Sequence, residues 1–304
     1  INLTGSDNTA VGNDSLRVNT TGSSNTVVGA NALDANTTAS NNTAIGKSSL
    51  GNNTTGGNNT GLGWGSLGQN TTASNNVAVG YNCLGANTTG IQNTAVGVAA
   101  LDANTDSHNN TAIGYLALSA HTSGSGNNTA LGAQTLQNTT TGGNNTAAGT
   151  DALRVNTTGA SNTALGANAL DSNTTASNNT AVGRLALGAN TTGAQLTAVG
   201  GNALDANTTG NYNVAMGRNA LGSNTTGSNN VGIGLQALEA STTASNNTAV
   251  GFVSLINQTT GEQNTAVGAE ALDASTTGFQ NVALGFRALS SLTISGRNTA
   301  VGFE

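Results

Sequence analysis

Residues 8–24 read NTAVGNDSLRVNTTGSS and residues 25–41 read NTVVGANALDANTTASN, so one 17-residue pattern occurs twice in succession. The pattern runs through the whole chain, with one inserted residue before position 128; its units start at 8, 25, 42, 59, 76, 93, 110, 128, 145, 162, 179, 196, 213, 230, 247, 264, 281 and 298. We number the positions of a unit from 1 to 17, beginning at its first Asn. Tandem repetition of this kind is typical of a solenoid, in which neighbouring units cover one another.

Several positions of the unit hardly vary, which indicates what a stacked site tolerates. Position 5 is Gly in all 18 units, beginning with Gly12, and this predicts a backbone bend that a β-carbon would block. Leu at position 9 and Thr at position 13 occur in all 17 complete units, beginning with Leu16 and Thr20. Asn at positions 1 and 12, as at Asn25 and Asn19, is expected to form ladders of side-chain amides between units.

Two stretches of the unit alternate with the period of a β-strand. In the first, Thr at position 2 and Val, Ile or Leu at position 4 share one parity, and the occasional Val at position 2 favours an inward site. In the second, positions 9, 11 and 13 share one parity. A helix is disfavoured because the apolar positions do not recur at spacings of three and four. The sequence predicts an all-β, parallel β-solenoid (β-roll) of about 17 coils, forming a single domain over residues 1–304 as a segment of a longer fibre protein.

Position 3 has the opposite parity, yet it is Ala in 15 units and never carries a long polar side chain. Something must therefore pack closely against it. One explanation is an opposing turn of the same coil, and the other is a neighbouring protomer, since oligomers also cover apolar faces. The second explanation makes Ala95, Ala112 and Ala181 candidate interface residues.

The composition excludes several functions. Seven Lys or Arg residues against 13 Asp or Glu give a net charge of −6, so we expect no nucleic-acid partner. No apolar run approaches the roughly 20 residues of a membrane span, so membrane insertion is not expected. No catalytic or metal-ligating constellation is visible, and we expect neither an enzyme nor a cofactor. Cys83 occupies the small position 8, His121 replaces the Asn of position 12, and His108 lies in a turn; each is expected to be structural.

Position 6 varies freely and carries aromatic residues in several units. They are Trp64, Tyr81, Tyr115, Phe252 and Phe286. An outward column of rings could stack on the sugar rings of a surface glycan or pack against a receptor protein. The alternative is subunit packing or drift at a permissive site.

The NTAVG stretch and the following Ala-Leu resemble the head repeats of trimeric autotransporter adhesins. The complete unit over residues 162–178 is even more similar to the repeats of phage tail fibres and related tail-fibre-domain proteins. The resemblance implies a homotrimer that serves as a stiff, non-enzymatic shaft or head of a fibre in host attachment, located outside the cell at a virion or cell surface. The chain departs from the adhesin heads in its longer unit, which contains an NTTG segment, and it has no coiled-coil heptads.

A shorter similarity links the repeat to grass-type ice-binding β-rolls, which also contain N-x-V-x-G and N-N-T-V elements. Ice binding is therefore the alternative function. It requires two outward Thr columns, for which positions 13 and 14 are the candidates. Adjacent strand residues face opposite ways, so both columns lie outward only if this segment is bent.

Overall fold

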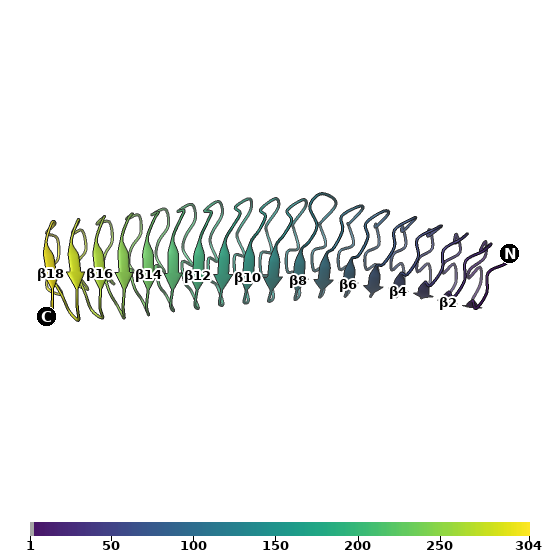
Figure 1. The fold of residues 1–304 in the computed structure, drawn as a ribbon, viewed down its shortest axis with the longest axis horizontal. Helices are drawn as coiled ribbons and strands as arrows, with labels where there is room; N and C mark the ends of the chain where they lie inside the picture. The colour runs from purple at the N-terminus through teal and green to yellow at the C-terminus, as the bar shows by residue number, and fades with distance from the viewer. Residues whose placement is uncertain (1–2) are drawn as a thin grey trace. The chain divides into compact units, whose positions relative to one another are not determined.

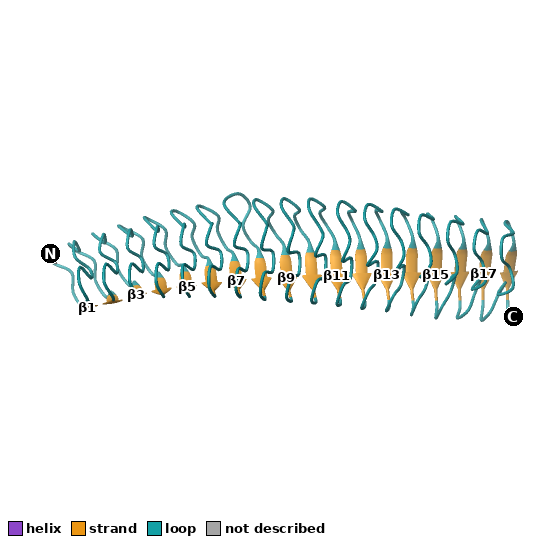
Figure 2. Cartoon of the chain, turned by 180° about the vertical axis from the view of Figure 1, so that it is seen from behind, coloured by secondary structure: helices purple, strands orange, loops and turns teal. Residues whose placement is uncertain are grey.

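The computed structural model describes residues 3–304, and within them the chain is an all-β, parallel β-solenoid with one short strand in each of the 18 repeat units. This confirms the predicted fold class. No helix occurs among residues 3–304. Figure 2 shows that each coil consists of one strand, in orange, and a longer loop, in teal.

The chain divides into two compact units of the same repeat. The first comprises the chain up to Asp151 together with Asn156–Thr158, and the second comprises Ala152–Val155 and Gly159–Glu304. The first unit contains β1 (Thr9–Val11), β2 (Thr26–Val28), β3 (Thr43–Ile45), β4 (Thr60–Leu62), β5 (Val77–Val79), β6 (Thr94–Val96), β7 (Thr111–Ile113), β8 (Thr129–Leu131) and β9 (Thr146–Ala148). The second contains β10 (Thr163–Leu165), β11 (Thr180–Val182), β12 (Thr197–Val199), β13 (Val214–Met216), β14 (Val231–Ile233), β15 (Thr248–Val250), β16 (Thr265–Val267), β17 (Val282–Leu284) and β18 (Thr299–Val301). The single domain that the sequence predicts over residues 1–304 remains a prediction.

Within each unit the strands pair in parallel and in register, so that every position lies beside its equivalent in the next coil. Thr43 pairs with Thr60 in the first unit and Thr180 pairs with Thr197 in the second. Figure 1 shows neighbouring strands of each unit side by side and pointing the same way. Each of the 17 positions therefore becomes a column of like side chains, spaced by the roughly 4.8 Å between paired strands.

The structure reverses the predicted orientation of the strand. Ala95, Ala112 and Ala181 at position 3 are 0% exposed within the single chain, whereas positions 2 and 4 are exposed or half-buried. A β-carbon added at Gly61, also position 3, would lie 2.5 Å from Oγ of Ser49 at position 8. Position 3 therefore packs inside the coil, against the opposing turn. The inward orientation of positions 2 and 4 was wrong, and the three alanines cannot form a protomer interface because the chain's own atoms cover them.

The second predicted strand, over positions 9 to 13, is also wrong, because positions 6 to 11 form turns and positions 13 and 14 form a bend. Leu101, at position 9, has a left-handed backbone with φ of 53° and a fully buried side chain. Its N–H still donates to the carbonyl of Ala117 in the next coil at 3.0 Å, so backbone bonds between coils continue outside the strands. A left-handed conformation costs a leucine about 1–2 kcal/mol. Burial of its side chain contributes about 1.5–3 kcal/mol and offsets that cost.

The invariant Gly of position 5 meets the predicted constraint. Gly183 has a φ of +134°, and a β-carbon there would lie 2.6 Å from the carbonyl oxygen of Gly200 in the next coil. Both the dihedral angle and the close approach of two backbones require glycine. The predicted block to a β-carbon is confirmed.

The predicted amide ladders are confirmed in two different forms. At position 12, Asn70 Nδ2 donates to Asn53 Oδ1 at 2.7 Å, a side-chain to side-chain bond between coils. At position 1, Oδ1 of Asn42 accepts from the backbone N–H of Asn59 at 2.9 Å. At position 13, the hydroxyl of Thr54 donates to a carbonyl one coil on, at 3.0 Å. Three side-chain columns thus bond one coil to the next.

Candidate interaction surfaces

The outer face of the strands carries an uncovered apolar column. Position 4 is apolar in all 18 units, and position 2 is Thr or Val, so no charged residue occurs at either position. Leu62, Leu131 and Met216 are among the exposed members, Leu131 being 50% exposed. We call positions 2 and 4 the outer sheet face. Sequence reasoning missed this surface because it assigned these positions to the interior.

The position 6 aromatics are on the surface, as predicted. Trp64, Tyr81, Tyr115, Phe252 and Phe286 are all exposed, and Trp64 is 47% exposed. The structure brings only the first two of them together: the rings of Trp64 and Tyr81 stack with centroids 4.9 Å apart and planes at 12°. Tyr115 lies beyond a coil with Val98 at this position.

One aromatic contact was missed in the sequence. Phe286 stacks on Phe303 with ring centroids 5.3 Å apart. Phe303 is position 6 of the last, partial unit, so extending the repeat to the end of the chain would have found it. Arg287 lies over the Phe286 ring at 5.5 Å, which gives this pair a cation–π contact.

A groove of about 660 Å³ lies beside Trp64 in the first unit. Glycine occupies position 10 in three consecutive coils, at Gly51, Gly68 and Gly85, and all three line the groove. Because like positions lie side by side, three missing side chains in adjacent coils hollow the surface. This groove was not predicted, although a run of glycine in one column was visible in the sequence.

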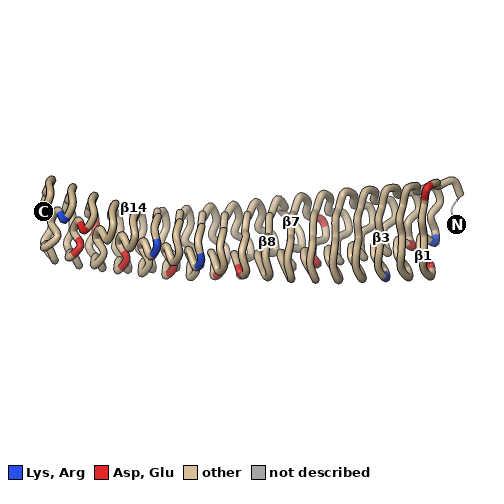
Figure 3. Tube along the Cα trace, turned by 90° about the horizontal axis from the view of Figure 1, so that it is seen from below, with Lys and Arg blue, Asp and Glu red and all other residues tan. Residues whose placement is uncertain are grey.

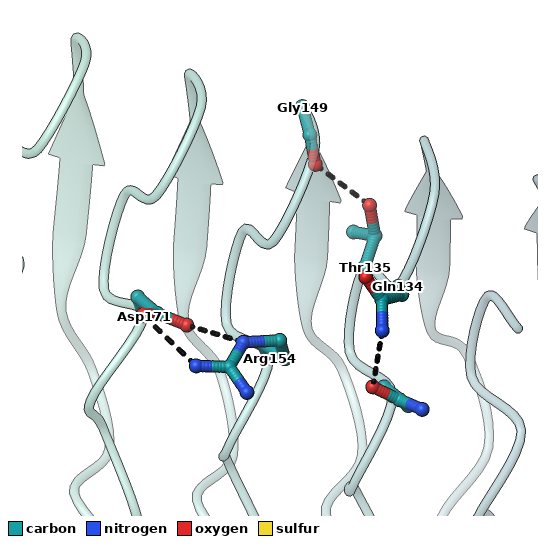
Figure 4. Close-up of polar contacts among 6 residues, drawn as sticks. Gln134, Thr135, Gly149, Arg154 and Asp171 are labelled. Atoms are coloured by element: carbon teal, nitrogen blue, oxygen red, sulfur yellow. Dashed lines mark hydrogen bonds and ion pairs between the residues drawn. The ribbon is translucent and has the colours of Figure 1, made fainter.

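Charged residues are scattered and partly paired between coils. Figure 3 shows that the basic residues are spread out along each of the two compact units and do not form a cluster. Arg154 Nε lies 3.1 Å from Asp171 Oδ1, one coil on, as Figure 4 shows. In the same view the hydroxyl of Thr135 donates to the carbonyl of Gly149 at 2.7 Å. Half-exposed ion pairs of this kind contribute about 0–1 kcal/mol, so they are minor beside the ladders.

The cysteine and both histidines occupy structural sites. Cys83 is fully buried, and burial raises the pKa of its thiol to about 12. Nδ1 of His108 accepts from the N–H of Ile91 at 3.0 Å, replacing the serine hydroxyls that accept this bond in other coils. His121 is 0% exposed, and neither of its ring nitrogens has a hydrogen-bond partner among residues 3–304. Burial lowers the pKa of His121, while the carboxylate of Asp106 opposes that shift.

The Thr columns considered for ice binding lie on a bent segment. Position 13 is half-buried and position 14 is exposed, as at Thr37 and Thr38. The hydroxyl of Thr37 donates to the carbonyl of Thr54 at 3.2 Å, so it is engaged within the protein. Position 14 remains as an exposed Thr column.

Among residues 3–304, no three His, Cys, Asp or Glu side chains lie close enough together to hold a metal ion. The described part of the chain has no helix of the length and apolarity that crossing a membrane requires. Neither a family model nor a curated protein matches the chain.

Proposed function

We propose that the chain is a structural, non-enzymatic element of a surface fibre, in which copies of the solenoid associate through the outer sheet face. The observation that carries this proposal is the apolar column at position 4, uncharged in all 18 units and uncovered in the single chain. Contiguous apolar surfaces of this kind are typical of interaction sites.

A second copy of the same chain fits this face best. The side chains of the column repeat at the roughly 4.8 Å spacing of paired strands. Only another stack with the same spacing stays in register with it over many coils. A homotrimer follows from the resemblance to trimeric fibre repeats, and three such faces meeting at an axis would cover one another. The same resemblance supports a location at a virion or cell surface and a role in host attachment.

The test is the mass of the 29.5 kDa chain in solution, measured by light scattering on a size-exclusion column. The interface variant combines Leu62→Lys, Leu131→Lys and Met216→Lys, whose sites lie in separate, non-adjacent coils. The control combines Val98→Lys, Leu235→Lys and Phe252→Lys, which are exposed apolar residues of position 6. We expect a trimer for the wild type and the control, and a folded monomer for the interface variant. A monomeric wild type, or a trimer that survives the interface changes, would contradict the proposal.

Ice binding is the second candidate, and the exposed Thr column at position 14 favours it. Its hydroxyls repeat at the spacing of the coils, about 4.8 Å. The hydroxyls of position 13 are bonded within the protein, which counts against an ice-binding face made of two Thr columns. Thermal hysteresis and ice-crystal shaping distinguish the two functions, because a fibre element should show neither.

A further inference from the structure

We propose that the groove beside Trp64 binds a neutral, hexose-based oligosaccharide. The groove spans the first five coils, with lining residues at positions 6, 7, 10 and 11, away from the outer sheet face. The proposal is therefore independent of the oligomeric state proposed above. It rests on an aromatic platform, a hollow that the fold does not require, and a polar rim of suitable chemistry.

Trp64 provides the platform. Its indole lines the groove, while Tyr81 of the following coil stacks on it in a nearly parallel orientation. A stacked partner restrains the indole ring, and the other neighbour of that ring along position 6 is Lys47 of the preceding coil. An aromatic face packs well against the C–H face of a hexose ring, and both surfaces are apolar with polar edges.

Two of the glycines that line the hollow are not required by the repeat. Gly65, at position 7, has a φ of +65°, but Asn31 and Asn82 adopt the same left-handed conformation at this position with side chains. A β-carbon at Gly65 would lie 3.5 Å from its nearest neighbour, and one at Gly51 would lie 3.4 Å from its own, both ordinary contacts. The fold could therefore carry side chains at both sites, and their absence opens space that a ligand can use.

The rim supplies hydrogen-bonding groups suited to hydroxyls. Asn52 Nδ2 donates to Gln69 Oε1 at 2.9 Å, which orders two neighbouring amides at the groove. Amides both donate and accept, as sugar hydroxyls do. Arg17 lies 3.8 Å from an oxygen of Asp14 and 3.7 Å from one of Asp34, so one cation is shared between two carboxylates. Arg17 is the one cation among the lining residues and is already paired with two carboxylates, so the lining favours a neutral saccharide over an acidic sugar or a phosphorylated ligand; Lys47, at position 6 beside Trp64, lies outside the lining.

The second unit provides an internal comparison. A groove of about 380 Å³ at the same repeat positions is lined by amides and carboxylates, including Asn202, Asn219 and Glu239. Its coils carry no aromatic residue at position 6, where Gly201 stands in one of them. A polar rim thus recurs without a platform, and we assign saccharide binding only to the groove that has both.

The experiment applies the full chain to a printed array of neutral and acidic glycans and then titrates a soluble form of the strongest ligand by calorimetry. Two variants remove the site: Trp64→Ala deletes the platform, and Gly65→Asn fills the hollow with a residue that position 7 carries elsewhere. Two matched controls lie outside it: Tyr212→Asn removes another exposed ring, and Gly201→Asn adds the same side chain at an open site. Circular dichroism verifies that each variant is folded.

We expect binding to neutral hexose-containing glycans, a loss of affinity of about tenfold or more in each site variant, and unchanged affinity in both controls. Absence of binding to any printed glycan would overturn the proposal. Binding that survives both site variants, or that depends equally on Tyr212, would also overturn it by placing the ligand elsewhere. Selective binding of acidic glycans would contradict the predicted ligand class. None of these outcomes depends on whether the chain is a trimer.

Discussion

Asn36 donates its side-chain amide to Oδ1 of Asn19, the equivalent residue one coil earlier, across 2.7 Å. The same Nδ2 also lies 3.1 Å from the carbonyl oxygen of Ala39, and both asparagines are fully buried. Buried amides are tolerated when their polar atoms are bonded, and they are costly when they are not. Each asparagine of the column is therefore necessary to both of its neighbours.

Removing one ladder residue should consequently cost each of its two neighbours in the column one hydrogen bond. Asn70 donates to Asn53 and accepts from Asn87 at 2.9 Å, so we expect Asn70→Ala to lower the free energy of unfolding by about 2–4 kcal/mol. Chemical denaturation followed by circular dichroism measures the loss. Asn13→Ala, at an exposed position 6, is the control and should change stability by less than about 0.5 kcal/mol. Equal effects of the two changes would refute the ladder argument.

The same ladder can be repaired where the chain interrupts it. Ser241 replaces Asn at position 12, and both its Oγ and Oδ1 of Asn224 are buried without a partner in the described residues. Ser241→Asn should bond to Asn224 and raise the free energy of unfolding by about 1 kcal/mol. The exposed Ser223→Asn adds the same side chain outside the column, and we expect no gain from it. A destabilised Ser241→Asn protein would show that the site cannot accommodate the amide.

Two glycines of adjacent coils can be compared, because the structure requires glycine at one of the two positions and not at the other. Gly183→Ala places a β-carbon 2.6 Å from the carbonyl of Gly200, whereas Gly201→Ala meets nothing within 4 Å. We expect the first change to cost several kcal/mol through a clash and a disfavoured dihedral angle, and the second to be nearly neutral. Thermal melting of the two proteins provides the comparison, and similar melting temperatures would contradict it.

Acid should weaken the coil that contains His121. Burial lowers the pKa of His121 in the folded chain, and the carboxylate of Asp106 opposes that shift without cancelling it. The unfolded chain therefore binds the proton on His121 more tightly than the folded chain does. The contribution of neutral His121 to the free energy of unfolding is complete above about pH 6.5 and is lost as the pH falls through the folded pKa.

The variant His121→Asn tests this pH dependence. Unfolding free energies measured between about pH 7 and 5 should decline less in this variant than in the wild type. His108→Ser, which introduces the hydroxyl found at this position elsewhere, is the control and should keep the wild-type decline. Parallel pH profiles for the wild type and His121→Asn would exclude His121 as the cause.

The buried thiol reports on opening of the coil. A pKa of about 12 keeps Cys83 protonated at neutral pH, and its side chain is 0% exposed. The thiolate is the reactive form, so we expect a maleimide or disulfide reagent to modify Cys83 only when the coil unfolds. Modification should accelerate steeply as denaturant is added. Rapid modification of the native protein would show that this coil opens readily.

The sequence by itself determined the solenoid, its parallel register, the Gly column, the amide ladders and the structural site of Cys83. These features were accessible because repetition within one chain records what a residue's neighbours above and below permit. The exposure of Trp64 and Tyr81 was also predictable, since position 6 varies freely. The trimer, the fibre role and ice binding were not determined in this way and remain proposals.

The tertiary structure alone decided which way the strands face. Three residues are too few for alternation to distinguish inside from outside, and Thr94 and Val96 suit a core as well as Ala95 does. The chain closes over Ala95 because Leu101 and its equivalents turn back in a left-handed conformation, a choice that favours burial of leucine over its backbone preference. Closure also placed Gly51, Gly68 and Gly85, each 17 residues from the next, side by side in one groove.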